Sequence, residues 1–223
     1  MRWRLVFYLQ INGYSVFRND RNRNGGGVAL FIKSDLQPKM CNHLQNPNVE
    51  SVWVTLKNGK SQILISSMYL PPSATVDTFD LLMTNIESAI SFGEHVVICG
   101  DLTIDYAKDN GGHCSIKLIE NLFGMTQLIQ EPTRETLHTS SIIDHILTNE
   151  LEKHTLSGVI KYSISDHNFT YTCINVAREK VTGTPRFTKT RNYNKINVAE
   201  FRQDIQQSNV FETLLHTHNV FEC

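Results

Sequence analysis

The sequence predicts an α/β fold, and two neighbouring stretches carry this prediction. Residues 96–99, VVIC, form a continuous apolar run rich in β-branched residues, which is typical of a strand buried on both faces. Between residues 77 and 92 the apolar side chains recur at helical spacing instead, and Gly93 follows where such a helix would end. A helix that leads directly into a buried strand indicates an α/β arrangement.

Further elements are expected on both sides of this unit. Residues 50–56 alternate apolar and polar side chains, and residues 62–69 follow after a turn at Asn58-Gly59, so the two are expected to form an antiparallel hairpin. A shorter helix is expected at residues 115–123, and the other expected strands cover residues 28–33, 125–129, 142–148 and 169–176. The glycine triplet before residue 28 precedes a strand, whereas nucleotide-binding glycine loops follow one, so no nucleotide site is expected there.

The composition excludes several classes of protein. A chain of 223 residues with 40% apolar residues can bury the core of one domain, and a formal net charge of −1 gives no global basic surface for nucleic acid. The five cysteines are widely spaced and include no CxxC pair, which argues against a disulfide framework and a zinc site and favours an intracellular location, nuclear or cytoplasmic. The first thirteen residues have neither a cleavage site nor the length of a membrane anchor, so no membrane partner is expected.

Acidic residues and histidines follow or interrupt three of the expected strands. Asp101 stands where the strand at residues 96–99 ends, Asp144 interrupts an apolar run, and Asp166-His167 precede the last strand. Each alone is explained as well by a turn or a solvated loop, because Asp is a common turn residue. At the carboxyl ends of strands in an α/β sheet, however, such residues are in the place where ligands bind.

Taken together, these motifs resemble those of the endonuclease/exonuclease/phosphatase superfamily, and most nearly those of the endonuclease domains of non-LTR retrotransposons. The matching segments stand in the order of that family and are NGGGVALFI (24–32), ESVWV (50–54), YLPP (69–72), GDLTID (100–105), SIIDHI (141–146) and SDH (165–167). The resemblance implies a layered α/β sandwich of two packed mixed β-sheets with outer helices. It also implies a hydrolase that cuts DNA phosphodiesters with Mg²⁺ or Mn²⁺.

The resemblance assigns a role to each matching residue. His167 would engage the scissile phosphate or activate water, and Asp144 would orient its imidazole. Asp101 would position the water or protonate the leaving group, while Tyr69 would donate a hydrogen bond to the phosphate. Asp166 would contribute to the metal site, since carboxylate oxygens suit Mg²⁺.

Two departures from the family pattern predict impaired activity. The family has an asparagine on its first strand and a metal-binding glutamate in a Q-E motif, both ahead of the segment that here begins the chain, so we expect an N-terminally truncated domain that lacks the first strand-helix unit and binds metal weakly. Glu50 is the first glutamate in the sequence, and it falls where the family has a structural residue. Thr103 stands in place of the asparagine of the GDxN motif, which donates to the phosphate.

The expected domain organisation is an endonuclease-like domain at residues 1–176, a basic linker at 177–196 and a helical tail at 197–223. In the relatives such a linker leads towards a reverse transcriptase module, which the sequence does not contain. Three functions remain open at this point. They are a DNA endonuclease, an inactive remnant that binds nucleic acid or a protein, and a phosphatase of the same superfamily that acts on inositol phosphates or a lipid head group.

Overall fold

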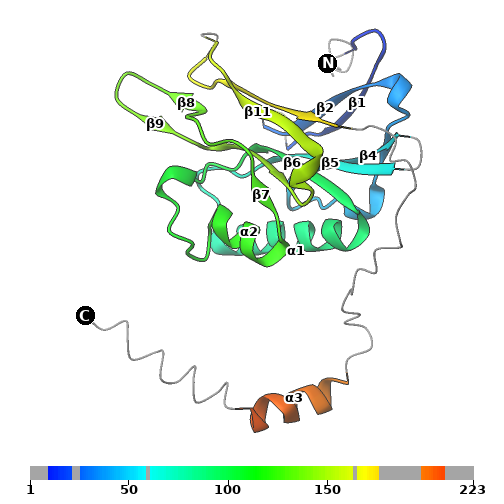
Figure 1. Ribbon diagram of the computed structural model, residues 1–223, viewed down its shortest axis with the longest axis vertical. Coiled ribbons are helices and arrows are strands. Elements are labelled where there is room, and N and C mark those ends of the chain that lie inside the picture. Colours follow the sequence, from blue (N-terminus) through cyan, green and yellow to red (C-terminus); the bar gives the residue numbers. More distant parts are fainter. Residues whose placement is uncertain (1–9, 22–25, 59–60, 163–164, 176–196, 209–223) are drawn as a thin grey trace, which may run out of the picture. The chain divides into compact units, whose positions relative to one another are not determined.

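The structure is a computed structural model that describes residues 10–21, 26–58, 61–162, 165–175 and 197–208. The chain divides into two compact units, Met1–Arg178 and Glu179–Cys223, which are described separately. Of the described residues, the first unit contains all the sheets and two of the three α-helices (Figure 1).

A six-stranded sheet forms the centre of the first unit. Its strand order is β3 (Lys39–Met40), β4 (Glu50–Asn58), β5 (Ser61–Tyr69), β6 (His95–Asp101), β10 (Asp144–Thr148) and β7 (Thr126–Gln127). The predicted hairpin is confirmed as the antiparallel pair β4–β5, whereas β5 and β6 are parallel and are connected through helix α1 (Val76–Phe92). Strand β10 lies between β6 and β7 and is antiparallel to both, so the sheet is mixed.

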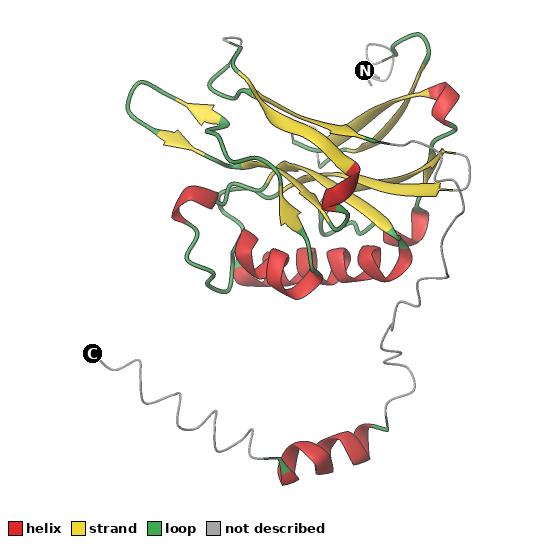
Figure 2. Ribbon diagram, viewed as in Figure 1, coloured by secondary structure: helices red, strands yellow, loops and turns green. Residues whose placement is uncertain are grey.

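Two helices cover one face of this sheet (Figure 2). Helix α1 begins after Thr75, whose side chain accepts a hydrogen bond from the Thr78 amide, and α2 (Ile116–Phe123) begins after Ser115 in the same way. Gly124 ends α2 in the left-handed conformation, with a φ of 62°. The apolar faces of both helices pack on the sheet in one buried cluster whose largest members include Trp53, Phe79, Leu82, Ile86, Ile98 and Ile119.

Two antiparallel hairpins lie over the opposite face of the sheet (Figure 1). The first pairs β1 (Tyr14–Asn19) with β2 (Val28–Lys33), and the second pairs β11 (His154–Ile160) with β12 (Phe169–Ile174). A second core cluster joins the sheet to the second hairpin and is built on Ile63, Val97, Ile129, Ile142 and Ile146. The predicted layered α/β sandwich is thus confirmed, and among the described residues these two hairpins form its outer β-layer.

A further small hairpin, β8 (Arg134–Glu135) with β9 (Ser140–Ser141), extends from the loop before β10. Single turns of 3₁₀ helix occur at Ser34–Leu36, Asn42–Leu44, Tyr106–Lys108 and Leu151–Lys153. The strand expected at residues 125–129 is shorter than predicted, since only Thr126 and Gln127 pair with β10. Strands β1 and β11 were not predicted, because polar residues interrupt their apolar pattern.

The second unit contains helix α3 (Val198–Gln207). The side chain of Asn197 accepts hydrogen bonds from the amides of Ala199 and Glu200, so the predicted helix start is confirmed. The basic linker expected at residues 177–196 lies outside the described residues, as does most of the predicted tail beyond α3. No described helix has the length and apolarity required to cross a membrane.

Candidate active site

The site is built on a row of residues paired across three neighbouring strands. Tyr69 at the end of β5 is paired with Asp101 at the end of β6, and Asp101 is paired with Asp144 at the start of β10. Directly paired residues direct their side chains to the same face of a sheet. The three side chains therefore share one edge of the sheet and the face opposite the helices.

Gly100 allows the strands to come together at this edge. A Cβ atom added to Gly100 would overlap the carbonyl oxygen of Met68 on the neighbouring strand β5. Only a residue without a side chain fits this close approach of two backbones. The glycine of the Gly-Asp motif is therefore required by the packing that delivers Asp101 to the site.

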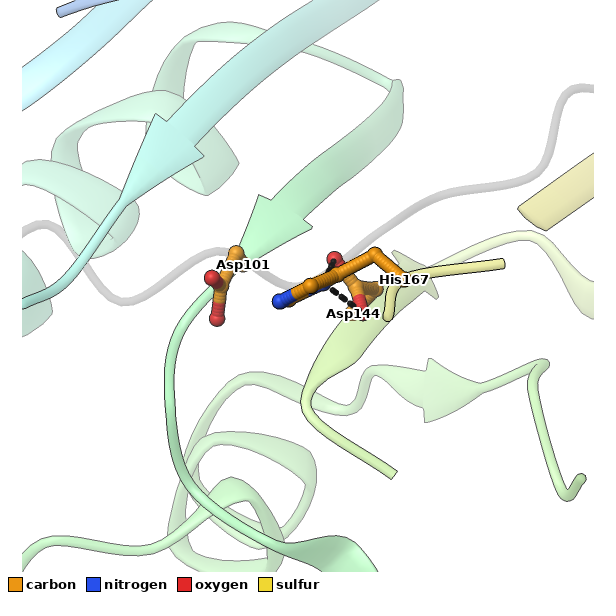
Figure 3. A group of neighbouring side chains, drawn as sticks. All are labelled: Asp101, Asp144 and His167. Carbon is orange, nitrogen blue, oxygen red and sulfur yellow. Dashed lines mark hydrogen bonds and ion pairs between the residues drawn. The ribbon is translucent and has the colours of Figure 1, made fainter. Parts of the chain in front are cut away.

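Three of the predicted residues converge at this edge. Asp101, Asp144 and His167 each present one polar atom, and these atoms lie within 4.8 Å of one another. His167 Nδ1 lies 3.1 Å from Oδ1 and 3.0 Å from Oδ2 of Asp144, so its N–H donates to this carboxylate. Figure 3 shows the imidazole between the two carboxylates, with its other ring nitrogen directed toward Asp101. This side of the ring is left to accept a proton or to meet a substrate.

The segment 133–135 fixes His167 beside Asp144. The buried Thr133 hydroxyl accepts hydrogen bonds from the Ile143 and Asp144 amides, at 3.1 and 3.0 Å. Arg134 is joined to His167 by an antiparallel β-bridge, and the Thr133 carbonyl accepts a hydrogen bond from the Asn168 amide. No site residue was predicted at Pro132-Thr133-Arg134, because nothing in the composition of this segment indicates that it links two site residues.

Asp101 and Thr103 form a tight turn at the end of β6. The Thr103 amide donates to Asp101 Oδ1 at 2.9 Å, and Thr103 has a φ of 53°. Left-handed backbone is uncommon for a β-branched residue and is better tolerated by asparagine. Burial raises the pKa of the Asp101 carboxyl, and the nearby Asp144 carboxylate raises it further, while the Thr103 amide acts in the opposite direction.

A pocket of about 480 Å³ opens at this cluster. Its walls include the predicted residues Tyr69, Asp101, Thr103 and His167. They also include two cations that sequence reasoning did not select, Lys108 and Arg134, and residues of the β8–β9 hairpin such as Ser140 and Ser141. The lining thus combines the acids Asp101 and Asp105 with the two cations, and Lys108 pairs with Asp105 at 2.9 Å. A polar pocket with converging titratable groups is a candidate substrate site.

Asp166 lies apart from the three converging groups. Its carboxylate accepts a hydrogen bond from Arg134 Nε at 2.7 Å, and 43% of its side chain is exposed. The hydrogen bond from the Arg134 guanidinium lowers the pKa of Asp166. Its assignment as a metal ligand therefore remains a prediction, because the grouped donors in the described part of the chain are Asp101, Asp144 and His167.

The donor set fits a hard divalent cation. Two carboxylates on paired strands supply oxygen ligands, which Mg²⁺ and Mn²⁺ prefer, and Mg²⁺ is commonly held by one or two carboxylates. The pKa of Asp101 is raised mainly by burial and to a lesser extent by the Asp144 carboxylate, and a cation bound between the two carboxylates would stabilise their charged forms. Asp101 and Asp144 are thus the residues that would hold the ion.

Comparisons with known proteins agree with this geometry. Residues 63–171 match the protein family described as endonuclease-reverse transcriptase, whereas no curated protein matches the sequence. The endonuclease domain of TRAS1, a telomere-specific non-LTR retrotransposon, is 19% identical with a TM-score of 0.62, and the alignment covers 74% of this chain and 81% of that domain. Likeness at this level of identity shows the fold.

Two other solved structures share the fold with different described activities. A 3′–5′ exonuclease from Neisseria meningitidis is 16% identical with a TM-score of 0.52, over 73% of this chain and 80% of that one. A mannosyl-6-phosphatase from Bacteroides thetaiotaomicron is 14% identical with a TM-score of 0.50, over 71% and 75% of the two chains. The chain therefore has the fold of the endonuclease/exonuclease/phosphatase superfamily, and its residues 63–171 match the endonuclease-reverse transcriptase family within it.

Proposed function

We propose that this protein is a divalent-metal-dependent phosphodiester hydrolase that cuts DNA as an endonuclease. The observation that carries the proposal is the convergence of Asp101, Asp144 and His167 within 4.8 Å of one another, beside a polar pocket that Asp101 and His167 line. The family match and the fold of the TRAS1 endonuclease domain support the same class of reaction.

In the proposed reaction His167 acts as the general base. Because its Nδ1–H donates to Asp144, its Nε2 carries a lone pair that can take a proton from water. The Asp144 carboxylate holds the imidazole in this tautomer and stabilises it once it is protonated. The water oxygen then attacks phosphorus, and the bond from phosphorus to the leaving alkoxide breaks.

The other residues position the phosphate and the water. Asp101 is placed to orient the water or the leaving oxygen, and the Tyr69 hydroxyl and the Thr103 hydroxyl are donors on the pocket wall. A divalent cation held by Asp101 and Asp144 would supply charge stabilisation for the phosphate oxygens. Arg134 and Lys108 add positive charge on the same wall.

A plasmid-nicking assay tests this function. Purified full-length protein should convert supercoiled plasmid to the open circular form with Mg²⁺ or Mn²⁺ and should not do so with EDTA. The matched control is the His167→Ala variant prepared in parallel. Equal nicking by the wild type and this variant would overturn the proposal and leave an inactive nucleic-acid-binding or protein-binding domain.

The superfamily phosphatase is the second candidate, because the fold is shared with a sugar phosphatase. Release of inorganic phosphate from inositol phosphates without plasmid nicking would favour it. The engagement of Asp144 with His167 serves either reaction, so substrate and not site geometry separates the two.

A further inference from the structure

The row of paired residues at the active-site edge continues beyond Tyr69 to a fourth strand. Glu50 at the start of β4 is paired with Tyr69, which in turn is paired with Asp101. Its side chain therefore lies on the same face of the sheet as the candidate site. Sequence reasoning gave Glu50 only a structural place and assigned no role to Gly26 and Gly27, the two described glycines that precede β2.

Glu50 binds Arg21, which follows the end of β1. Arg21 Nη1 lies 3.1 Å from Glu50 Oε1, and the Gly27 amide donates to Glu50 Oε2 at 2.9 Å. The Glu50 side chain is only 17% exposed, whereas the Arg21 side chain is 43% exposed. The carboxylate is thus an inner anchor, and the guanidinium is the part of the pair that solvent and ligands reach.

The glycines make this arrangement possible. A Cβ atom on Gly26 would overlap the guanidinium of Arg21, and one on Gly27 would lie 2.6 Å from the Asn19 carbonyl oxygen. Both glycines have left-handed φ values, 86° and 106°. The side-chain Nδ2 of Asn19 donates to the Ser51 carbonyl at 3.1 Å, which fastens the end of β1 next to Glu50.

The guanidinium lies over the ring of Tyr69, a residue of the candidate active site. Its central carbon lies 5.9 Å from the centroid of the Tyr69 ring, and Tyr69 lines the pocket that holds Asp101 and His167. A guanidinium held by a carboxylate on one side and a ring on the other keeps its planar fork oriented. Arginine forks of this kind suit phosphate, which accepts two parallel hydrogen bonds.

We propose that Arg21 binds a backbone phosphate of DNA adjacent to the phosphate that enters the pocket, and that Glu50 and the two glycines hold it for this contact. The nature of the ligand rests on the proposed function. If the Arg21–Glu50 pair had only a structural role, it would be a surface ion pair that contributes little to the stability of the fold. The two roles differ in what they predict for DNA affinity and its salt dependence.

The test measures binding of a fluorescent DNA duplex by anisotropy, with Ca²⁺ in place of Mg²⁺, over a series of salt concentrations. R21A is expected to bind about tenfold more weakly, as for loss of one charge-assisted contact. The slope of log affinity against log salt should fall in magnitude by about 0.9, as for loss of one phosphate contact. R18A is the matched control, because Arg18 lies on the same hairpin but pairs with Asp20 at 2.6 Å, and its affinity should match the wild type.

A second variant guards against a folding defect in R21A. R21Q keeps a donor for Glu50 but has no charge, so it should retain the wild-type melting temperature and still lose the same affinity. R21K should keep the salt slope, because it retains the charge, but bind more weakly than arginine. Three results would each overturn the assignment. They are wild-type DNA affinity in R21Q, an equal loss of DNA affinity in R18A and R21Q, and no DNA binding by the wild type.

Hydrolysis of bis(p-nitrophenyl) phosphate separates this inference from the proposed function. This small diester enters the pocket without a neighbouring phosphate, so R21Q should hydrolyse it at the wild-type rate. A wild type that binds duplex DNA through Arg21 but hydrolyses the diester no faster than H167A would refute the catalytic proposal and leave the Arg21 assignment standing. Slower hydrolysis of the diester by R21Q at unchanged melting temperature would overturn the assignment.

Discussion

Asp101 and Asp144 are direct cross-strand partners in the antiparallel pair β6–β10. Paired positions on neighbouring strands hold side chains about 5 Å apart at their Cβ atoms, and like charges at such positions destabilise a sheet. The structure places His167 against one of the two carboxylates, which offsets part of this repulsion. The pair is thus an unfavourable arrangement for stability that suits the binding of a cation and a phosphate.

His167 and Asp144 should be needed for catalysis and not for folding. We expect H167A to lower the nicking rate by about 10²–10⁴-fold, the usual contribution of general base catalysis. D144N should lower it as well, because an amide no longer favours the productive imidazole tautomer. Plasmid nicking gives the rates and circular dichroism melting verifies the fold. A variant with near wild-type activity would exclude its residue from the proposed mechanism.

Divalent cations should stabilise the folded protein through Asp101. Any ligand that binds only the native state adds free energy of unfolding, about 2.7 kcal/mol at one hundred times its dissociation constant. Mg²⁺ or Mn²⁺ should therefore raise the melting temperature of the wild type, and the D101N variant should show little or no rise. Differential scanning fluorimetry with a metal titration measures this without any substrate. An equal rise in both proteins would place the ion elsewhere.

Replacing Thr103 with asparagine should raise both the stability of the protein and its nicking rate. Asparagine tolerates the left-handed backbone at this position, so T103N should raise the free energy of unfolding by about 1 kcal/mol. Its longer amide donor should also raise the nicking rate, by up to about 10²-fold for a restored phosphate contact. T103G is the control, since it relieves the backbone strain without supplying a donor. Equal rates in T103N and T103G would show that the asparagine makes no contact with the phosphate.

Gly100 should be the glycine least tolerant of substitution at this edge. G100A forces a Cβ atom onto the Met68 carbonyl, so the β5–β6 pairing must open, and we expect a loss of more than about 3 kcal/mol of stability. G112A is the comparison, because the nearest atom to its Cβ is the movable end of the Asn110 side chain, 3.1 Å away. Urea denaturation of both variants measures the difference. Similar midpoints would contradict the close approach of the two backbones.

The stability of the first unit should fall in mild acid because of His95. Burial lowers the pKa of His95 from 6.5 to about 4, and the charge of Lys153 and the neighbouring His154, 3.3 Å away, act in the same direction, while Glu152 opposes them. In the unfolded chain His95 is therefore protonated below pH 6.5, whereas in the folded chain it is protonated only below about pH 4. The contribution of neutral His95 to the free energy of unfolding is fully present above pH 6.5. It is lost as the pH falls from 6.5 to about 4, by up to about 3 kcal/mol.

The H95Q variant serves to isolate this effect. It should show a flatter decline in the free energy of unfolding between pH 6.5 and pH 4 than the wild type does, measured by urea denaturation at each pH. Parallel curves for the two proteins would assign the acid sensitivity to other groups.

Much of the fold was predictable because its central elements have strong local patterns. Val96 and Ile98 pack in the same cluster as the apolar face of α1, while Val97 and Cys99 pack on the opposite face of the sheet. The helical spacing of residues 77–92 and the continuous apolar run at residues 96–99 follow from this burial. Strand β11 has no such apolar pattern in its sequence, because it lies in the outer layer and only part of its surface is covered. Short strands such as β8 and β9 depend on contacts with distant segments and leave no local pattern.

The candidate site was predictable in its residues but not in its geometry. Asp101, Asp144 and His167 stood out through motif order, and the structure brings them together. Asp166 shares a motif with His167, yet the chain bends at Ser165 and Asp166, and Arg134 binds the Asp166 carboxylate away from the other three groups. The role of Arg134 could not be predicted, since a loop arginine in a sequence has no visible partner.

The position of β10 between β6 and β7 brings together side chains that are synthesised at different times. The two carboxylates are separated by more than forty positions along the polypeptide, and the imidazole follows only after the chain has passed through β11. During translation the supporting layers can therefore assemble while the reactive cluster is still incomplete. His167 is the last of the three residues to be synthesised, so they can come together only after translation has passed β11 and reached residue 167.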